Sequence, residues 1–419
     1  MVDLAPGRAP ATTRARRTAA HIALWVSLVA GLPASALAQD QAPTPPADPE
    51  PADARAVSVR APGAVAIGGV LRATARGLRS PVRVEVRRRG VWRPAGTPAR
   101  VPGAVMRVRA PDGPGTLRIR ARGSDGAVSR SRQVRVRALT LAAVGDVNLG
   151  DRPGQLMEQF GYAYPWTSVG PTLRRADLSL ANLECAVSRR GTPQDKQYVF
   201  RGRPEALRAM SRSGGIDVVN LANNHAGDFG DDALLDTLRN ARSLGMTPVG
   251  AGATETAAYR PQVLERLGLR VAFVGFSTIL PFEFRAVDNN PGTAWGFADR
   301  VRRSVQQARR QADVVVATFH WGIERDTVED ERERALARVA LDAGATVIIG
   351  GHPHVLQPIR RPTGRLVAYS LGNFVFGAGS PGTASTGILQ VGLGRGRVVS
   401  ARLLRADIRA TRPVLRGGG

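Results

Sequence analysis

The sequence of 419 residues contains a single cysteine, Cys185, which excludes an intrachain disulfide and a cysteine-rich zinc module. Lysine is almost absent as well, because Lys196 is the only one. No apolar stretch reaches the roughly 18 uncharged residues of a membrane-spanning helix, except a marginal one near the N-terminus. Hydrophobic residues make up 43% of the chain, which excludes collagen, coiled coil and disorder over the full length. The length predicts two or three domains.

The net charge of +25 is carried almost entirely by arginine and is unevenly distributed. Residues 56–138 hold 19 arginines and 3 acidic residues, a net charge of +16. A surface of this kind attracts polyanions such as nucleic acid, anionic lipid headgroups or an acidic polymer. The alternative is that arginine only replaces lysine throughout this composition.

The N-terminal residues 1–38 have the order of a secretory signal peptide. Four arginines precede an apolar run at 22–32, and Ala36-Leu37-Ala38 forms a cleavage site of the A-x-A type. We expect an exported protein, periplasmic or extracellular and either free or membrane-associated, with an uncleaved anchor as the alternative. Residues 39–55 are rich in proline and acidic residues and predict an extended linker.

Residues 56–138 predict a small all-β domain of immunoglobulin-like type. Polar and apolar residues alternate strictly over 82–87, 117–122 and 134–137, and clusters of Gly and Pro separate these segments. A period of two is typical of strands with one buried and one solvated face. The arginines fall on the solvated faces, where they serve either to dock the domain on an anionic polymer or only to keep a spacer soluble.

Residues 139–413 predict an α/β domain, and residues 414–419 a flexible tail. Short apolar runs alternate with helix-like segments that begin at Pro or acidic residues and end at Gly, which favours buried strands between helices. The expected strands are 141–144, 178–181, 218–221, 271–274, 314–317, 347–349 and 367–369, and the expected helices are 204–212, 231–244, 301–311 and 329–343.

Polar side chains follow five of these strands. The carboxyl ends of strands in an open α/β sheet meet at one edge, where ligands bind. All four histidines outside the signal segment lie at such positions, with carboxylate and amide side chains beside them. A donor set of Asp, Glu, Asn and His without a thiolate suits Mn, Zn or Fe. The alternative is a polar site without a metal. The expected metal ligands are Asp146, Glu184, Asn224, His320, His352 and His354.

The remaining candidates are expected around this metal site. His225, beside Asn224, can serve as a general acid. Trp321 is either a wall of the site or a platform for substrate, and Glu324 a partner of the ligands. The segment 369–374, which contains Asn373, shapes the rim. The residues expected to bind substrate are Asn148, Asn223, Trp321, Glu324 and Asn373.

Six motifs, taken together and in order, resemble the CapA family of poly-γ-glutamate capsule biosynthesis proteins. The resemblance covers about residues 140–376. The motifs are Gly145-Asp146-Val147-Asn148-Leu149-Gly150, Asn182-Leu183-Glu184, Leu221-Ala222-Asn223-Asn224-His225 with Asp228 and Gly230, His320-Trp321-Gly322, Gly351-His352-Pro353-His354-Val355-Leu356-Gln357 and Tyr369-Ser370-Leu371-Gly372-Asn373-Phe374.

This family is similar in fold to the calcineurin-like metallophosphoesterases, which implies a four-layer αββα arrangement. The likeness implies that Asp146, Glu184 and His225 are catalytic, with Glu184 bridging the ions and His225 protonating the leaving group. Asn148 stands where the phosphoesterase pattern has a histidine, so the resemblance leaves open whether the site binds one ion or two. The implied function is synthesis, export or trimming of poly-γ-glutamate or a similar anionic polymer by a metal-dependent hydrolase.

The partners implied are this polymer and membrane-bound capsule synthesis machinery. Two alternatives stay open, namely a secreted metallophosphoesterase with an unrelated substrate and a non-catalytic factor that binds an anionic polymer. Nucleic acid is not expected as a partner, because the basic segments lack interleaved aromatic residues.

Overall fold

The computed structural model describes residues 57–417, and the predicted signal peptide and linker lie outside this range. The described residues all belong to one compact unit. The mixed α/β class predicted from the sequence is confirmed by several sheets and a small number of helices. Among the described residues, no helix is long and apolar enough to span a membrane.

Residues 57–137 contain strands and no helix. The strands form a three-stranded sheet of order β1-β3-β6 and a five-stranded sheet of order β2-β8-β7-β4-β5. Apolar side chains from both sheets share one core, as the alternating sequence predicts. The strands are β1 Ser58–Arg60, β2 Ala64–Ala66, β3 Val70–Arg76, β4 Val82–Arg88, β5 Val91–Ala99, β6 Met106–Arg109, β7 Gly115–Arg122 and β8 Arg132–Arg137.

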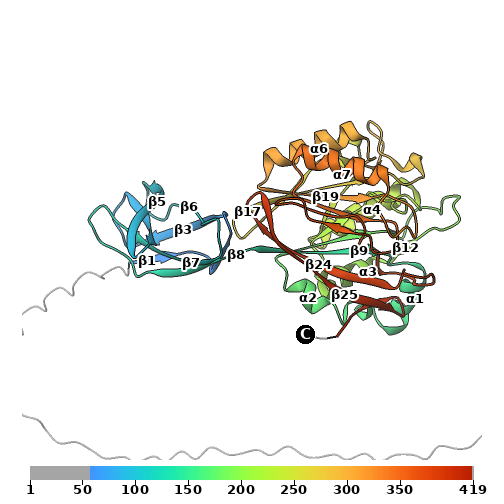
Figure 1. Cartoon of the computed structure of the whole chain (residues 1–419), viewed down its shortest axis with the longest axis horizontal. Coiled ribbons are helices and arrows are strands. Elements are labelled where there is room, and N and C mark those ends of the chain that lie inside the picture. The colour runs from blue at the N-terminus through green and yellow to red at the C-terminus, as the bar shows by residue number, and fades with distance from the viewer. Residues whose placement is uncertain (1–56, 418–419) are drawn as a thin grey trace, which may run out of the picture. The chain divides into compact units, whose positions relative to one another are not determined.

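The next part of the chain is built on two large sheets, which lie between two groups of helices in Figure 1. The first sheet has the order β14-β13-β10-β9-β24-β25-β26, with β23 paired to β9. Its first four strands are parallel, and β24 to β26 extend it antiparallel. These strands are β9 Leu139–Val147, β10 Leu178–Leu183, β13 Val218–Asn220, β14 Thr247–Val249, β23 Asn373–Val375, β24 Ser385–Gly394, β25 Arg397–Arg409 and β26 Arg412–Leu415.

The second sheet has the order β16-β17-β19-β20-β22-β21. Its central strands are parallel and almost wholly buried, which accounts for their continuous runs of Val, Ile and Ala. Its strands are β16 Gln262–Arg266, β17 Leu269–Ser277, β19 Val314–His320, β20 Val347–Gly351, β21 Ile359–Arg360 and β22 Leu366–Ala368. Two short strand pairs lie outside the two large sheets. They are β11 Ala186–Val187 with β12 Arg201–Gly202, and β15 Ala251–Gly252 with β18 Gly292–Thr293.

Three apolar clusters hold the layers together. One lies between the two sheets and contains Leu141 of β9 and Val316 of β19. The other two lie on the outer faces, where helices cover each sheet. The helices on the first sheet are α1 Asp151–Phe160, α2 Gly170–Arg174, α3 Pro204–Ala209 and α4 Gly230–Ser243. The helices on the second sheet are α6 Ala298–Gln311 and α7 Glu331–Ala343. Helix α5, Glu255–Ala258, is a single turn.

The two helices on the second sheet follow from local sequence. In α6, Val301, Val305 and Ala308 are buried, a spacing of four and three residues that gives one apolar face. Helix α7 begins with a capping box in which Asp330 and Glu333 each accept a hydrogen bond from the other's backbone, and it ends at Gly344 in the left-handed conformation.

The C-terminal boundary differs from the prediction. Strand β26 includes Val414 and Leu415, which pair with Asp407 and Ala406 of β25. Residues 414 and 415 therefore belong to the sheet and not to the flexible tail predicted at 414–419, because this edge strand is held by backbone hydrogen bonds that its short sequence does not reveal.

Candidate metal centre

The two large sheets bring their carboxyl ends to one place. Asp146 lies in β9 and Glu184 directly follows β10, both from the first sheet. His320 ends β19, and His352 and His354 directly follow β20, both from the second sheet. The parallel register aligns Asn182 with Asp146 and His320 with Gly351. Residues separated by up to about 200 positions are thus neighbours because parallel strands end together.

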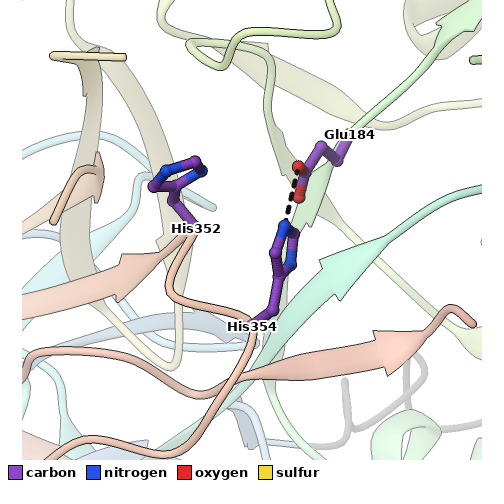
Figure 2. A group of neighbouring side chains, drawn as sticks. All are labelled: Glu184, His352 and His354. Atoms are coloured by element: carbon purple, nitrogen blue, oxygen red, sulfur yellow. Dashed lines mark ion pairs between the residues drawn. The ribbon is translucent and has the colours of Figure 1, made fainter. Parts of the chain in front are cut away.

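Five of these side chains form two groups whose nitrogen and oxygen atoms lie within 4.8 Å of one another. One group is Glu184, His352 and His354, and the other is Asp146, Glu184 and His320. Figure 2 shows the first group, with the ion pair between Glu184 and His354 dashed. Glu184 belongs to both groups, which is the place that a bridging carboxylate would take.

Burial strongly shifts the pKa values of several side chains in this cluster. Asp146, Glu184 and His320 are fully buried. Burial and then the neighbouring Asp146 raise the pKa of Glu184 well above its ordinary value. Burial and then the other histidines lower the pKa of His320 well below its ordinary value, and burial and then His354 lower the pKa of His352 to about 3.

His354 behaves in the opposite way. Burial opposes its charged form, but Glu184 and Asp146 outweigh burial and raise the pKa of His354 to about 9. Its Nδ1 lies 3.4 Å from Asp146 Oδ2 and its Nε2 lies 3.9 Å from Glu184 Oε1. Two buried carboxylates therefore require a positive charge between them, which a protonated histidine or a cation supplies.

The residues present fit a divalent ion. Among the described residues, Glu184 Oε1 and His352 Nδ1 are buried without any hydrogen-bond partner. Buried polar atoms of this kind call for an explanation, and a bound ion is one. The donor set of carboxylates and imidazoles without a thiolate suits Mn, Zn or Fe.

The loop after β20 passes close to the Asp146 carboxylate. A Cβ atom on Gly351 would collide with Asp146 Oδ1, so only glycine allows the loop to pass this carboxylate. The His352 backbone N–H then donates to Asp146 Oδ2 at 3.0 Å. His352 and His354 have φ values of 94° and 59°, in the left-handed region that residues other than glycine rarely adopt. Such strain concentrates at functional sites.

A network of asparagines fixes the ligands. The Asn182 side-chain amide donates to Asp146 Oδ1 at 2.8 Å and lies 3.0 Å from His320 Nδ1. Asn220 Nδ2 donates to Asn182 Oδ1 at 2.9 Å. The Asn224 side-chain oxygen lies 2.8 Å from His320 Nε2, so the predicted ligands Asn224 and His320 meet.

The residues predicted to bind substrate have varied surroundings, and that role stays a prediction. Asn148 Oδ1 accepts from the Gly150 N–H at 2.8 Å, and Asn223 Nδ2 donates to the Leu183 carbonyl at 2.8 Å. Trp321 is buried and stacks on Phe319 at 4.3 Å between ring centres.

The last two of these residues lie nearer to the cluster. Asn373 Oδ1 lies 2.8 Å from His354 Nδ1, where it orients the ring of a predicted ligand. Glu324 lines a cavity of about 500 Å³ together with His225 and Asn224.

Lys196 and the role of Asp228 were not predicted from the sequence. Asp228 is fully buried, and its Oδ1 receives a hydrogen bond from Lys196 Nζ at 2.5 Å. Its Oδ2 lies 2.7 Å from His225 Nδ1 and accepts from the Phe200 N–H at 2.7 Å. A signal was present, because Lys196 is the only lysine in an arginine-rich chain.

The part of the chain that holds the candidate site matches a known protein family. Residues 140–378 match the family described as "Bacterial capsule synthesis protein PGA_cap". The chain belongs to this family. All the metal-ligand candidates of this PGA_cap protein lie within the matched residues, whereas strands β1 to β8 lie outside them.

Two curated relatives carry related names. The chain is 32% identical to "PGA biosynthesis protein CapA" of Bacillus subtilis over 66% of this chain and 73% of that protein. It is also 32% identical to "Capsule biosynthesis protein CapA" of Bacillus anthracis over 60% of this chain and 63% of that protein. A solved structure of a hypothetical protein from Thermus thermophilus matches with a TM-score of 0.42 and 19% identity, covering 64% of this chain and 99% of that chain.

Proposed function

We propose that this PGA_cap protein acts in the synthesis, export or trimming of poly-γ-glutamate or a similar anionic capsule polymer through a metal-dependent hydrolase site. The observation that carries the proposal is the convergence of Asp146 and Glu184 with His320, His352 and His354 where the two sheets end. The names of the Bacillus relatives support the choice of polymer. The layers of helices and sheets support a fold related to the metallophosphoesterases.

The residues that would hold the ions are Asp146, Glu184, Asn224, His320, His352 and His354. A divalent metal supplies Lewis-acid activation of oxygen and a water of lowered pKa. The protein supplies oriented ligands, since Asn182, Asn373 and the Gly351 loop each fix one of them. Asn148 stands where the phosphoesterase pattern has a histidine, and its side-chain oxygen accepts a hydrogen bond from the Gly150 backbone N–H. This supports a centre in which the two ion positions have different sets of ligands.

His225 is proposed as the proton donor to the leaving group. Burial lowers its pKa, and the hydrogen bond to Asp228 opposes this shift. Asp228 holds Nδ1, and the Phe200 ring stacks on the imidazole at 4.1 Å between ring centres. This leaves Nε2 for the reacting group. The cavity that His225 lines also presents Lys196, Tyr198 and Glu324, so a charged substrate can be accommodated beside it.

Export and domain organisation complete the proposal. The charged, apolar and small-residue order of residues 1–38 supports export to the periplasm or outside the cell, and residues 39–55 would tether the folded part. Residues 56–138 are proposed as a small β domain of immunoglobulin-like type, and the apolar core that its two sheets share supports this.

The test is incubation of the purified full chain with poly-γ-glutamate and Mn²⁺ or Zn²⁺, with polymer length followed by size-exclusion chromatography. The proposal expects shortening of the polymer, lost in His225→Ala and retained in the control Arg310→Ala on the exposed face of α6. Release of phosphate from generic phosphoesters without polymer shortening would instead support the metallophosphoesterase alternative. An intact polymer and intact phosphoesters would contradict hydrolysis.

A further inference from the structure

The outward face of the five-stranded sheet is covered by arginine. In β4, β7 and β8 the apolar residues point into the core, and the alternating positions point outward. We use the name arginine face for seven of these outward residues, which are Arg83, Glu85, Arg87, Arg118, Arg120, Arg122 and Arg135. The neutral residues Thr116 and Gln133 lie among them.

The register of the strands places one pair of like charges on this face directly opposite each other. Arg83 of β4 lies directly opposite Arg122 of β7. Arg118 lies on β7 between Arg120 and Thr116, and Thr116 is opposite Arg135 of β8. Like charges directly across a strand pair destabilise a sheet. Glu85 lies opposite Arg120. The neutral residues Gln133 and Thr116 lie opposite Arg118 and Arg135, so the repulsion is relieved over part of the face only.

Glu85 holds two of the arginines in place. Its Oε2 lies 2.6 Å from Arg120 Nε, and its Oε1 lies 2.7 Å from Arg122 Nε. Burial opposes ionisation of Glu85, but the hydrogen bonds from Arg122 and Arg120 lower its pKa, so the carboxylate is charged. The Arg120 guanidinium also covers the Trp92 ring at 4.5 Å. Two cationic groups are therefore ordered in advance, which reduces the entropy lost on binding.

The other arginines are open to a ligand. Arg83, Arg87, Arg118 and Arg135 are exposed, and none of them has a carboxylate within 4.0 Å among residues 57–417. Neighbouring strands are about 4.8 Å apart, and alternate residues along a strand about 6.8 Å apart. A linear chain with a carboxylate on each repeat can thus contact several guanidinium groups at once, each able to bind a carboxylate in bidentate fashion.

We propose that the arginine face binds a linear polycarboxylate of the poly-γ-glutamate type. It lies outside residues 140–378, so it would add a second polymer contact to the one at the candidate metal centre. Naming this polymer rests on the proposed function. Charge complementarity carries the choice of a polyanion. Proteins that bind single-stranded nucleic acid stack bases on aromatic rings, whereas here Trp92 is covered by Arg120.

The experiment measures binding of the full chain to fluorescently labelled poly-γ-glutamate by anisotropy, at low and at high salt. The triple variant Arg83→Gln/Arg118→Gln/Arg135→Gln removes three exposed charges from the face. Each exposed pair contributes a small part of the binding free energy, so we expect affinity to fall about tenfold in total and its salt dependence to decrease.

A matched triple variant controls for total charge. Arg60→Gln/Arg76→Gln/Arg107→Gln removes three exposed arginines from the outward face of the β1-β3-β6 sheet. We expect it to weaken binding by less than about threefold, since only long-range attraction is lost. Equal losses in both triple variants would overturn the proposal, as would unchanged affinity in the first. Thermal unfolding verifies that both variants fold.

Two further arms separate this proposal from its alternatives and from the proposed hydrolase. Single-stranded DNA or phosphatidylserine vesicles that compete as well as free poly-γ-glutamate would overturn the choice of a polycarboxylate. Adding His352→Ala/His354→Ala to the first triple variant should leave the fold-loss that the triple variant causes unchanged, because the arginine face and the metal centre are separate contacts. Binding through the face without any polymer shortening would uphold this proposal while the hydrolase proposal fails, and absence of polymer binding by the unmodified chain would overturn it.

Discussion

His225 and Asp228 form a buried hydrogen bond of 2.7 Å between imidazole Nδ1 and carboxylate Oδ2. The second carboxylate oxygen, Oδ1, receives a hydrogen bond from Lys196 Nζ at 2.5 Å. A carboxylate on Nδ1 fixes the tautomer and orientation of an imidazole and leaves Nε2 for proton transfer. This arrangement lies beside the metal-ligand candidate Asn224, so proton donation and metal binding would share one rim.

The variant Asp228→Asn tests this orientation. The amide retains the shape but removes the charge that holds His225 and Lys196. We expect the rate constant of the hydrolysis proposed above to fall about 100-fold or more, with a small change in KM, because general acid catalysis contributes this much. The tautomer of His225, read from long-range proton–nitrogen NMR spectra, should change as well. The control Asp407→Asn, half-exposed on strand β25, should alter neither, and an unchanged rate in Asp228→Asn would contradict the assignment.

Lys196 should stabilise the fold as well as the site. Lys196→Met leaves the buried Asp228 carboxylate without its cation, so we expect the free energy of unfolding to fall by about 3 kcal/mol. Lys196→Arg keeps the charge but cannot reproduce the compact ammonium geometry, so a smaller loss is expected. Urea unfolding measures both.

A double-mutant cycle identifies the source of this loss. In Lys196→Met/Asp228→Asn the unpaired charge is removed, so the combined loss should be smaller than the sum of the two single losses. Additive losses would show that the lysine and the carboxylate are not coupled.

Glu333 predicts a pH dependence of stability. Burial raises the pKa of this carboxyl to about 7 in the folded protein. Because the folded pKa lies above the unfolded one, stability is fully present below about pH 4.5 and is lost as pH rises through 7. Glu333→Gln keeps the capping hydrogen bond from Asp330 N–H and removes the titration. The variant should therefore be more stable at pH 8, by roughly 1–2 kcal/mol after solvent screening.

Thermal unfolding from pH 5 to pH 8 measures this difference. The control Glu331→Gln lies on the same first turn of α7 but is exposed, so its stability curve should follow that of the unmodified chain. A constant offset between Glu333→Gln and the unmodified chain at all pH values would contradict titration of Glu333 in this range.

The ligand candidates could be found from the sequence because their positions follow from one rule. Asp146, Glu184 and His320 lie at the ends of buried parallel strands, and such ends meet at one edge of a sheet. Only the family resemblance implies that these ligand candidates come from two sheets and not from one. Alternation alone predicts strands in residues 57–137, but the division into three and five strands depends on long-range pairing.

Other features depend on contacts that local patterns do not encode. Lys196 lies outside any helix or strand and reaches Asp228 across 32 positions. Trp321 follows His320 in the sequence, but its burial and its stacking on Phe319 depend on the packing of the second sheet. Strands β24 and β25 were not predicted, since Gly and Arg interrupt their apolar pattern; β24 pairs antiparallel with β9, and β25 pairs with β24.

The most direct measurement is elemental analysis of the full chain purified without chelator, beside His352→Ala/His354→Ala and the control Gln307→Ala on α6. We expect near-stoichiometric Mn, Zn or Fe in the unmodified chain and the control, and loss of that metal in the double histidine variant. Added metal should raise the Tm of the unmodified chain and leave that of the double histidine variant unchanged. No retained metal, even after addition of Mn²⁺ or Zn²⁺, or equal metal content in the double histidine variant, would contradict the candidate metal centre.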